Sequence, residues 1–534
     1  MISSTFENRL SQHSGLSAWV STGRTGEIER ELTLESLDAY IGYVQKFLGE
    51  LTQAGDRILV ENNGGIEFVV VFLATIFCRR VPIPVPVSTP RTEARTRSII
   101  DICHPSLQII VTGKQDIPSV VDSDCETQLR LPLLDQWRQE TNAEHSLSVG
   151  SPLFIQFTSG STGNPKGAPV TLANLEANLR QIERVFDTGK IRHLVNWLPK
   201  HHDMGLITSV FLPVWSGFRC VELNPVRVAG RPSLWLQAIS DFQAEASGGP
   251  SAMYQRCVDT IQDVEGLNLG NWRAAFCGSD FISRDTLHDF SVKFAPAGFR
   301  VEALMPCYGM AESTLLISSC PIQEKPKCVS SDQRLVDFDS TNASKRMSTG
   351  LICDGEVLIV DEKDQTLDDG LEGEILLHSP SVIEQYYGTD SKSEFFYRDD
   401  KRYLRTGDRG YLLANELVVS GRNKEMLSVF GRNVYLVDVD ELLKASFTAE
   451  IAMAAFFLEE DSVEQIAVCV AKVRNPDAAS RAHSEERINA VMTANYGCKP
   501  GAIWWSDMRY FPTTPSGKIA RHELTKLFHQ VSGS

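Results

Sequence analysis

A loop rich in glycine and hydroxyl side chains, residues 158–167, carries the clearest chemical signal in the sequence. It reads TSGSTGNPKG and follows an apolar segment predicted to be a strand, LFIQF at 153–157. Glycines let the backbone turn its amides inward, the hydroxyls add donors, and the lysine adds a positive charge. We therefore predict a polyphosphate site, with a flexible turn as the alternative. The predicted phosphate-binding residues are Thr158, Ser159, Gly160, Ser161, Thr162, Gly163 and Lys166.

This loop differs from the phosphate loops of common nucleotide-binding folds. The spacing from Gly160 to Lys166 fits G-x-x-x-x-G-K, but Pro165 stands where the second glycine belongs. The chain also contains no G-x-G and no G-x-S-x-G, which excludes a dinucleotide fingerprint and a hydrolase nucleophile elbow. Nearby, we expect the adjacent His201 and His202 to point to opposite sides of an extended segment rather than to share a metal ion.

The composition is that of a globular protein. Of 534 residues, 42% are hydrophobic and 22% are charged, which excludes wholesale disorder. Lys and Arg number 52 against 68 Asp and Glu, so the net charge of −16 disfavours nucleic acid and anionic membranes as partners. The longest apolar run, 68–78, is too short to span a bilayer, and no secretory signal is visible. We expect a cytoplasmic protein with buried free thiols, not disulfides or zinc.

Short apolar runs alternate with helical patterns over the first four hundred residues, and the pattern becomes strand-rich after residue 350. This order predicts an α/β fold with parallel sheets and crossover helices. We expect a large N-terminal domain of βαβ-type sheets plus a β-rich subdomain over 1–421, and a small, mobile α+β domain over 422–534. The predicted strands include 57–60, 81–87, 109–113, 153–157, 194–198, 218–223, 272–277, 355–361, 373–379 and 416–421, and the predicted helices include 66–79 and 171–186.

One polar segment, 320–350, has few periodic apolar residues. A solvated surface loop is one interpretation, and a functional insertion is the other.

Together with the glycine-rich loop, five further motifs closely resemble the adenylate-forming superfamily, which activates carboxylic acids with ATP. The combination looks like its fatty acyl-AMP ligase branch, and HDMGL (202–206) and FGRNVY (430–435) are the branch-specific parts. The segment 320–350 falls where that branch carries its insertion. The motifs are NWLPKHHDMGLI (196–207), PCYGMAEST (306–314), YLRTGDRG (403–410), SGRNKEML (420–427) and FPTTPSGKIARHEL (511–524).

The resemblance implies a role for each matching residue. Tyr308 would stack on adenine, Asp408 would accept both ribose hydroxyls, and Glu312 would hold Mg²⁺. Lys518 would be the adenylating lysine, and His202 would gate the acyl pocket. The remaining adenine- and ribose-binding residues are Gly278, Ser279, Asp280, Gly309, Met310 and Arg422, and Lys424 would be the hinge between the two domains.

The implied reaction has two steps. A carboxylic acid, in this branch a fatty or related acid, reacts with ATP and Mg²⁺ to give acyl-AMP and pyrophosphate. The acyl group then passes to the phosphopantetheine thiol of a holo acyl carrier protein or carrier domain, as in polyketide, nonribosomal peptide or lipid biosynthesis. An acyl-CoA ligase and a non-catalytic binding homologue are the alternatives.

Two features of the sequence bear on the acid and on the acceptor. SGGPSAMYQ (247–255) departs from the usual pocket helix, so long fatty acids are not assumed. Ser428 stands where CoA ligases of this superfamily often carry a lysine, which favours a carrier protein. Because carriers are usually acidic, we expect docking on a local basic patch. Its candidate residues are Arg509, Lys518, Arg521 and Lys526.

Overall fold

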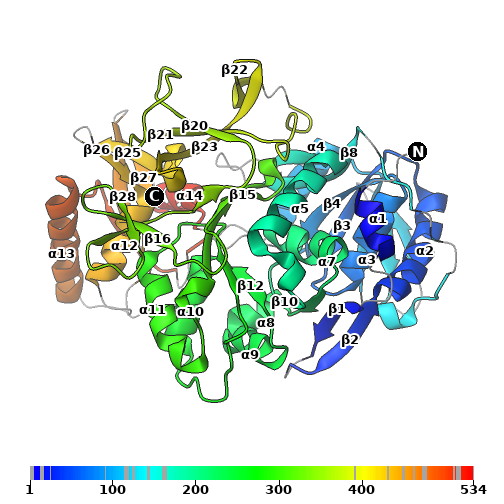
Figure 1. Ribbon diagram of the computed structural model, residues 1–534. Coiled ribbons are helices and arrows are strands. Elements are labelled where there is room, and N and C mark those ends of the chain that lie inside the picture. Colours follow the sequence, from blue (N-terminus) through cyan, green and yellow to red (C-terminus); the bar gives the residue numbers. More distant parts are fainter. Residues whose placement is uncertain are drawn as a thin grey trace.

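A computed structural model provides the coordinates (Figure 1). We call residues 5–422 the large lobe and residues 426–532 the small lobe. The structure describes residues 5–12, 17–23, 26–90, 92–112, 119–122, 127–140, 143, 145–148, 150–158, 165–389, 392–429, 432–447, 452–460, 463–471, 478–508, 511–512 and 519–532.

The largest sheet of the large lobe has the strand order β2-β1-β11-β10-β12-β13-β14-β15-β19-β24-β23-β21-β20, and β22 pairs with β23. Neighbours from β1 to β14 are parallel, and β15 pairs antiparallel with β14. The sheet therefore changes from a parallel to an antiparallel half at β14. The bounds are β1 (Ser17–Thr22), β2 (Ile28–Thr33), β10 (His193–Asn196), β11 (Arg219–Glu222), β12 (Ala246–Gly249), β13 (Ala274–Cys277), β14 (Leu304–Gly309), β15 (Leu316–Ser319), β19 (Leu351–Ile352), β20 (Glu356–Val360), β21 (Gly373–His378), β22 (Phe395–Arg398), β23 (Lys401–Leu413) and β24 (Glu416–Arg422).

A second sheet, β4-β3-β5-β7-β6, is parallel except for its edge strand β6. The helix between β3 and β4 is buried at every position, which explains why nearly all of its residues are apolar. A separate hairpin, β8 and β9, flanks the glycine-rich loop. The bounds are β3 (Arg57–Asn62), β4 (Val81–Pro86), β5 (Leu107–Val111), β6 (Ser119–Asp122), β7 (Thr127–Leu131), β8 (Pro152–Thr158) and β9 (Lys166–Thr171).

Helices cover these sheets and join their strands (Figure 1). The predicted helices at 66–79 and 171–186 and all of the predicted strands are present, so the α/β fold class is confirmed. The bounds are α1 (Thr5–Gln12), α2 (Leu34–Leu51), α3 (Glu67–Phe77), α4 (Glu93–Cys103), α5 (Leu172–Phe186), α6 (Asp203–Leu206), α7 (Leu212–Ser216), α8 (Pro225–Gly230), α9 (Ser233–Asp241), α10 (Ser251–Thr260) and α11 (Arg284–Phe294). Among the described helices, none is long and apolar enough to cross a membrane.

The small lobe combines a hairpin, a three-stranded sheet and helices around hydrophobic clusters of its own. Figure 1 shows α13 at the outer edge of this lobe and α12 facing α11 of the large lobe. The division of the chain at residue 421 and the mobility of the smaller part stay predictions. The bounds are β25 (Met426–Val429), β26 (Arg432–Tyr435), α12 (Leu436–Ser446), β27 (Met453–Glu460), β28 (Val463–Ala471), α13 (Ala478–Tyr496), β29 (Ile503–Ser506) and α14 (Arg521–Ser532).

The interpretation of 320–350 as a solvated loop is wrong. The segment forms a three-stranded antiparallel sheet of β16 (Lys327–Ser330), β17 (Leu335–Asp337) and β18 (Ala343–Met347). Cys328, Phe338 and Met347 are buried in the main core. Strands of three to five residues are too short to give a clear apolar period, which is why the sequence reads as a loop.

Candidate active site

The candidate site lies where parallel strands of the main sheet end. Parallel strands present their carboxyl ends at one edge, and ligands of open α/β sheets bind there. His202 follows β10, Gly278 follows β13, and Tyr308 lies at the end of β14. The same edge borders the point at which the sheet turns antiparallel. Motifs that are a hundred residues apart in the sequence therefore meet at one place.

Asp408 links the two groups predicted to hold adenosine. The Tyr308 hydroxyl donates to Asp408 Oδ2 at 2.6 Å, and Arg422 Nε lies 3.4 Å from Asp408 Oδ1. Antiparallel pairing of β23 with β24 places Asp408 directly opposite Arg422. Burial, and then the charge of Asp408, raise the pKa of Tyr308 well above its usual value, so the phenol stays a donor. The charge of Asp408 also raises the pKa of Arg422.

The predicted adenine edge is a tight turn after β13. A Cβ on Gly278 would lie 2.9 Å from both the carbonyl oxygen and Sγ of Cys307, so only glycine lets this turn approach β14 so closely. Ser279 adopts a left-handed backbone with φ of 73°. The Asp280 carboxylate accepts the backbone N–H of Phe281 at 2.9 Å. Ser279 and Asp280 line the cavity described below. Gly278 does not line it and packs against Cys307 instead.

The turn after β14 is equally constrained. A Cβ on Gly309 would lie 1.9 Å from the Leu315 carbonyl oxygen, and this same oxygen accepts the backbone N–H of Met310 at 2.9 Å. This closed turn carries Glu312, which is 6% exposed. The Tyr386 hydroxyl donates to Glu312 Oε1 at 2.8 Å. Burial raises the pKa of Glu312, and the Tyr386 hydrogen bond opposes that rise.

The hairpin β8–β9 brings Thr158 and Lys166 side by side. Lys166 Nζ lies 2.6 Å from Glu394 Oε1 and 4.8 Å from the centre of the Tyr386 ring. Sequence reasoning missed Tyr386 and Glu394, because no motif carries them. The centre of the predicted phosphate loop, Ser159, Gly160, Ser161, Thr162 and Gly163, lies outside the described residues, as does Lys518.

The expectation that His201 and His202 point to opposite sides is wrong. Their ring centres lie 4.5 Å apart, because the chain turns after β10 instead of staying extended. A Cβ on Gly205 would lie 2.2 Å from the Pro199 carbonyl oxygen, so glycine allows this turn. His201 is held by Asn62 Nδ2 at 3.1 Å and by Gln156 Nε2, which donates to its carbonyl at 2.8 Å. His202 alone of the pair lines the cavity.

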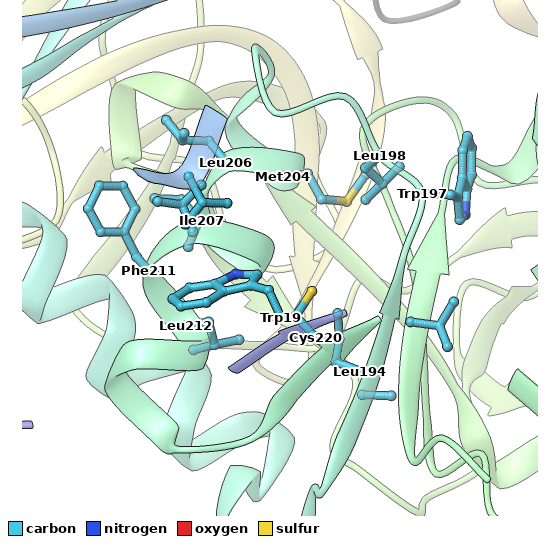
Figure 2. Packing of buried hydrophobic residues seen from close by; sticks show 14 of the residues in the cluster. Trp19, Leu194, Trp197, Leu198, Met204, Leu206, Ile207, Phe211, Leu212 and Cys220 are labelled. Atoms are coloured by element: carbon cyan, nitrogen blue, oxygen red, sulfur yellow. The ribbon is translucent and has the colours of Figure 1, made fainter. Parts of the chain in front are cut away.

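A buried ion pair supports the same turn. Lys200 Nζ lies 2.9 Å from Glu222 Oε2, and both side chains are almost completely buried. Figure 2 shows the apolar packing of this region, in which the side chains of Met204 and Leu198 lie next to each other. Helical residues Leu206, Ile207 and Phe211 are also buried there. The segment that presents His202 is thus fixed on its inner side by a salt bridge and by apolar contacts.

All of these elements surround one cavity of about 800 Å³. Besides the polar site residues, its lining includes apolar side chains of α5, α8, α10 and β13, and we call the part of the cavity that they line the apolar branch. The predicted site residues that line the cavity are Thr158, Lys166, His202, Ser279, Asp280, Tyr308, Gly309, Met310, Glu312, Asp408, Arg422 and Lys424. Lys424 lies directly after β24, between the lobes, and its role as a hinge stays a prediction.

The predicted basic patch of the small lobe needs one correction. Arg521 is largely buried, with NH2 at 2.8 Å from Asp440 Oδ2 and NH1 donating to the Ala455 carbonyl at 2.6 Å. It holds α14 against the small lobe and is not available to a partner. Lys526 is exposed, and Arg509 lies with Lys518 outside the described residues.

The chain matches the AMP-binding enzyme family over residues 6–387 and belongs to that family. It is 27% identical to the medium-chain-fatty-acid–[acyl-carrier-protein] ligase TtuA of Teredinibacter turnerae, over 93% of this chain and 89% of that one. It is 28% identical to the putative fatty-acid–CoA ligase fadD25 of Mycobacterium tuberculosis, over 94% of this chain and 92% of that one.

Comparison with solved structures finds the same kind of enzyme as comparison with sequences. A structure from a study of fatty acyl-adenylate ligases of E. coli and L. pneumophila has a TM-score of 0.84 at 24% identity, covering 100% of this chain and 98% of that one. The L. pneumophila ligase in complex with acyl adenylate and pyrophosphate has a TM-score of 0.69 at 26% identity, covering 98% and 95%. The predicted membership of the adenylate-forming enzymes, close to the fatty acyl-AMP ligases, is confirmed.

Proposed function

We propose that this protein converts a carboxylic acid and ATP to acyl-AMP and pyrophosphate, and then passes the acyl group to the phosphopantetheine thiol of a carrier protein. The observation that carries the proposal is the contact of Tyr308 and Arg422 with Asp408 at the rim of a cavity that Glu312 and His202 also line. The Asp408 carboxylate has two partners on its buried side and can be reached from the cavity on the other. A carboxylate placed in this way can accept both hydroxyls of a ribose.

Adenosine binding would use groups that are already in place. Asp408 is 7% exposed, so a ribose hydroxyl bound to it would gain from a low local dielectric. Arg422, at 41% exposure of its side chain, can turn part of its guanidinium toward the α-phosphate while keeping Asp408 as a partner. Because the carboxylate contacts the ribose before and during reaction, we expect it to contribute to nucleotide affinity more than to turnover.

Glu312 fits a Mg²⁺ ion that arrives with the nucleotide. Glu312 lines the cavity together with Lys166, and its carboxylate supplies the hard oxygen ligand that suits this ion. Within the described ranges, no group of three or more His, Cys, Asp or Glu side chains gathers to hold a metal. The remaining ligands would be phosphate and water oxygens. When bound, Mg²⁺ would neutralise phosphate charge.

In the first step, a carboxylate oxygen of the acid bonds to the α-phosphorus, and the bond from that phosphorus to pyrophosphate breaks. Catalysis would depend on positioning and on stabilising the developing charge. By resemblance, Lys518 supplies a mobile positive charge between the carboxylate and the α-phosphate. His202, which lines the same cavity, would orient the carboxyl end of the acid.

In the second step, the carrier thiol loses its proton, its sulfur bonds to the acyl carbon, and AMP leaves. The 320–350 sheet bears on the choice of acceptor because it touches both lobes. Arg346 NH2 lies 2.5 Å from Asp438 Oδ2 of α12, and Arg346 NH1 donates to the Ser420 carbonyl. Ser283 Oγ of the large lobe donates to Glu441 Oε2 at 3.3 Å. The contact of Arg346 with Asp438 supports the proposal that the insertion restricts rotation of the small lobe.

The test supplies acceptors in parallel. After acyl-AMP has been detected by mass spectrometry, the enzyme is mixed with CoA or with a panel of holo-carriers under the same conditions. We expect a carrier to be loaded and acyl-CoA to be scarce. Rapid acyl-CoA formation without carrier loading would instead assign the chain to the CoA ligases.

A further inference from the structure

The apolar branch of the cavity reaches the protein surface between α8 and α10. Val226 and Ala229 line it from α8, and Ala252 and Arg256 line it from α10. Ala252 and Arg256 are one helical turn apart and therefore share a face of α10. Val226 is 80% exposed, so this end of the branch is open to solvent. An acid that enters the branch with its carboxylate at His202 would direct its distal end toward this opening.

Arg256 places a positive charge at the opening. Its guanidinium makes no hydrogen bond or ion pair with any residue that the structure describes, whereas most arginines of the large lobe pair with a carboxylate or a carbonyl. The acid nearest along the helix, Asp259, accepts a hydrogen bond from Gln255 Nε2 at 2.8 Å. An arginine can lay its methylene groups along an apolar wall and keep its charged end at the mouth.

A second donor, the indole of Trp197, belongs to the lining of the same cavity. Trp197 is 6% exposed, and its indole Nε1 is buried without a hydrogen-bond partner among the described residues. A Cβ on Gly249 would lie 2.5 Å from the Trp197 ring, so glycine at the end of β12 makes room for this indole. Buried N–H groups are nearly always satisfied, and a substrate oxygen is one way to satisfy this one.

We infer that the preferred substrate is an acid with a second carboxylate at its distal end, an α,ω-dicarboxylic acid, and that Arg256 recognises that group. This inference rests on the proposed function. An unsubstituted alkyl chain would gain nothing from the guanidinium and would leave the Trp197 N–H unsatisfied. A cationic end would be repelled by Arg256. A distal carboxylate offers the planar pair of acceptors that a guanidinium binds best.

The experiment measures acid-dependent pyrophosphate exchange with dicarboxylic acids and with monocarboxylic acids of the same chain lengths. For the wild type we expect the KM of the best dicarboxylic acid to be about threefold to fivefold below that of its monocarboxylic match, because Arg256 is exposed to solvent. Arg256→Leu should raise the KM of the dicarboxylic acid by about that factor, with kcat little changed, and should leave monocarboxylic acids unaffected. Arg256→Lys should restore part of the preference, and Trp197→Phe should weaken it.

Arg300→Leu is the matched control, because Arg300 is an exposed arginine that does not line the cavity. Equal KM values for the two classes of acid in the wild type, or an Arg256→Leu variant with an unchanged preference, would overturn the inference and leave acyl-AMP formation intact. Exchange with no acid of either class would overturn the proposed function itself, and the inference with it.

Discussion

The adenosine pocket and the contact between the lobes are built from similar side chains in different surroundings. In the pocket, Asp408 is 7% exposed. It accepts a hydrogen bond from Tyr308 of β14 and forms an ion pair with Arg422 of β24. Between the lobes, Arg346 and Asp438 form an ion pair whose side chains are 21% and 30% exposed. The first arrangement is fixed by strand pairing on β23 and β24, and the second joins two separate cores.

This difference indicates which part of the protein is preorganised and which part can move. A buried polar group is costly to leave unpaired, so the pocket should keep its geometry with or without nucleotide. A partly exposed ion pair contributes about 1 kcal/mol or less, so this contact by itself holds the lobes together only weakly. Binding would then depend on the large lobe, and the succession of the two reaction steps on the small lobe.

The largest expected effect lies in the small lobe. Lys518→Ala should slow acyl-AMP formation by about 10²-fold or more, because the lysine acts on charge that develops in the transition state. ATP affinity should change little, since the preorganised pocket remains. Pyrophosphate release and calorimetry measure the two quantities, with Lys526→Ala as the control on the same lobe. Retention of more than a tenth of wild-type adenylation would remove Lys518 from this role.

A substitution in the adenosine pocket should instead lower ATP affinity more than turnover. Asp408→Ala removes the partner of both Tyr308 and Arg422, so we expect nucleotide affinity to fall by about tenfold or more. Turnover at saturating ATP should fall less. Calorimetric titration with ATP measures the affinity, and Asp369→Ala, at an exposed position, is the control. Unchanged affinity in the Asp408 variant would contradict the assigned ribose contact.

The free energy of unfolding should depend on pH through His201, which lies next to the pocket residue His202. Burial, followed by the charges of His202 and Arg95, lowers the pKa of His201 well below its usual value near 6.5. The unfolded chain therefore binds a proton that the folded chain does not, and stability is lost as the pH falls below about 6.5. Relative to His201→Asn, the wild type should lose about 1.4 kcal/mol of unfolding free energy per pH unit there. Denaturant titrations from pH 8 to 5 would refute this if the difference stayed constant.

The smallest effect is expected where the lobes touch. Arg346→Ala should weaken the contact by about 1 kcal/mol or less, an increase of about fivefold at most in the population of separated lobes. Acyl transfer to CoA should rise in proportion, with adenylation unchanged. This substitution tests the contact between the lobes more specifically than deletion of 320–350. The deletion would also remove Cys328 and Phe338 from the core. Lys345→Ala is the neighbouring control, and the same trace of acyl-CoA in all three proteins would show that Arg346 does not restrict transfer.

Local signals allowed much of the fold and most of the pocket to be predicted. Strands such as 153–157 and the motif around Tyr308 are continuous in sequence, so their structure could be inferred directly. Contacts made by residues far apart could not. Tyr386 reaches Glu312 across 74 positions, and Arg521 reaches Asp440 across 81. A charge whose partner lies that far away is easily taken for an exposed docking residue, as Arg521 was.

Acid-dependent exchange of labelled pyrophosphate into ATP tests the central claim most directly, because only a reversible acyl-AMP intermediate produces it. The account predicts exchange that requires both Mg²⁺ and a carboxylic acid, with acyl-AMP detectable by mass spectrometry and both signals lost in Lys518→Ala. A protein that binds ATP at Asp408 yet gives no exchange with any acid across a wide panel would contradict it.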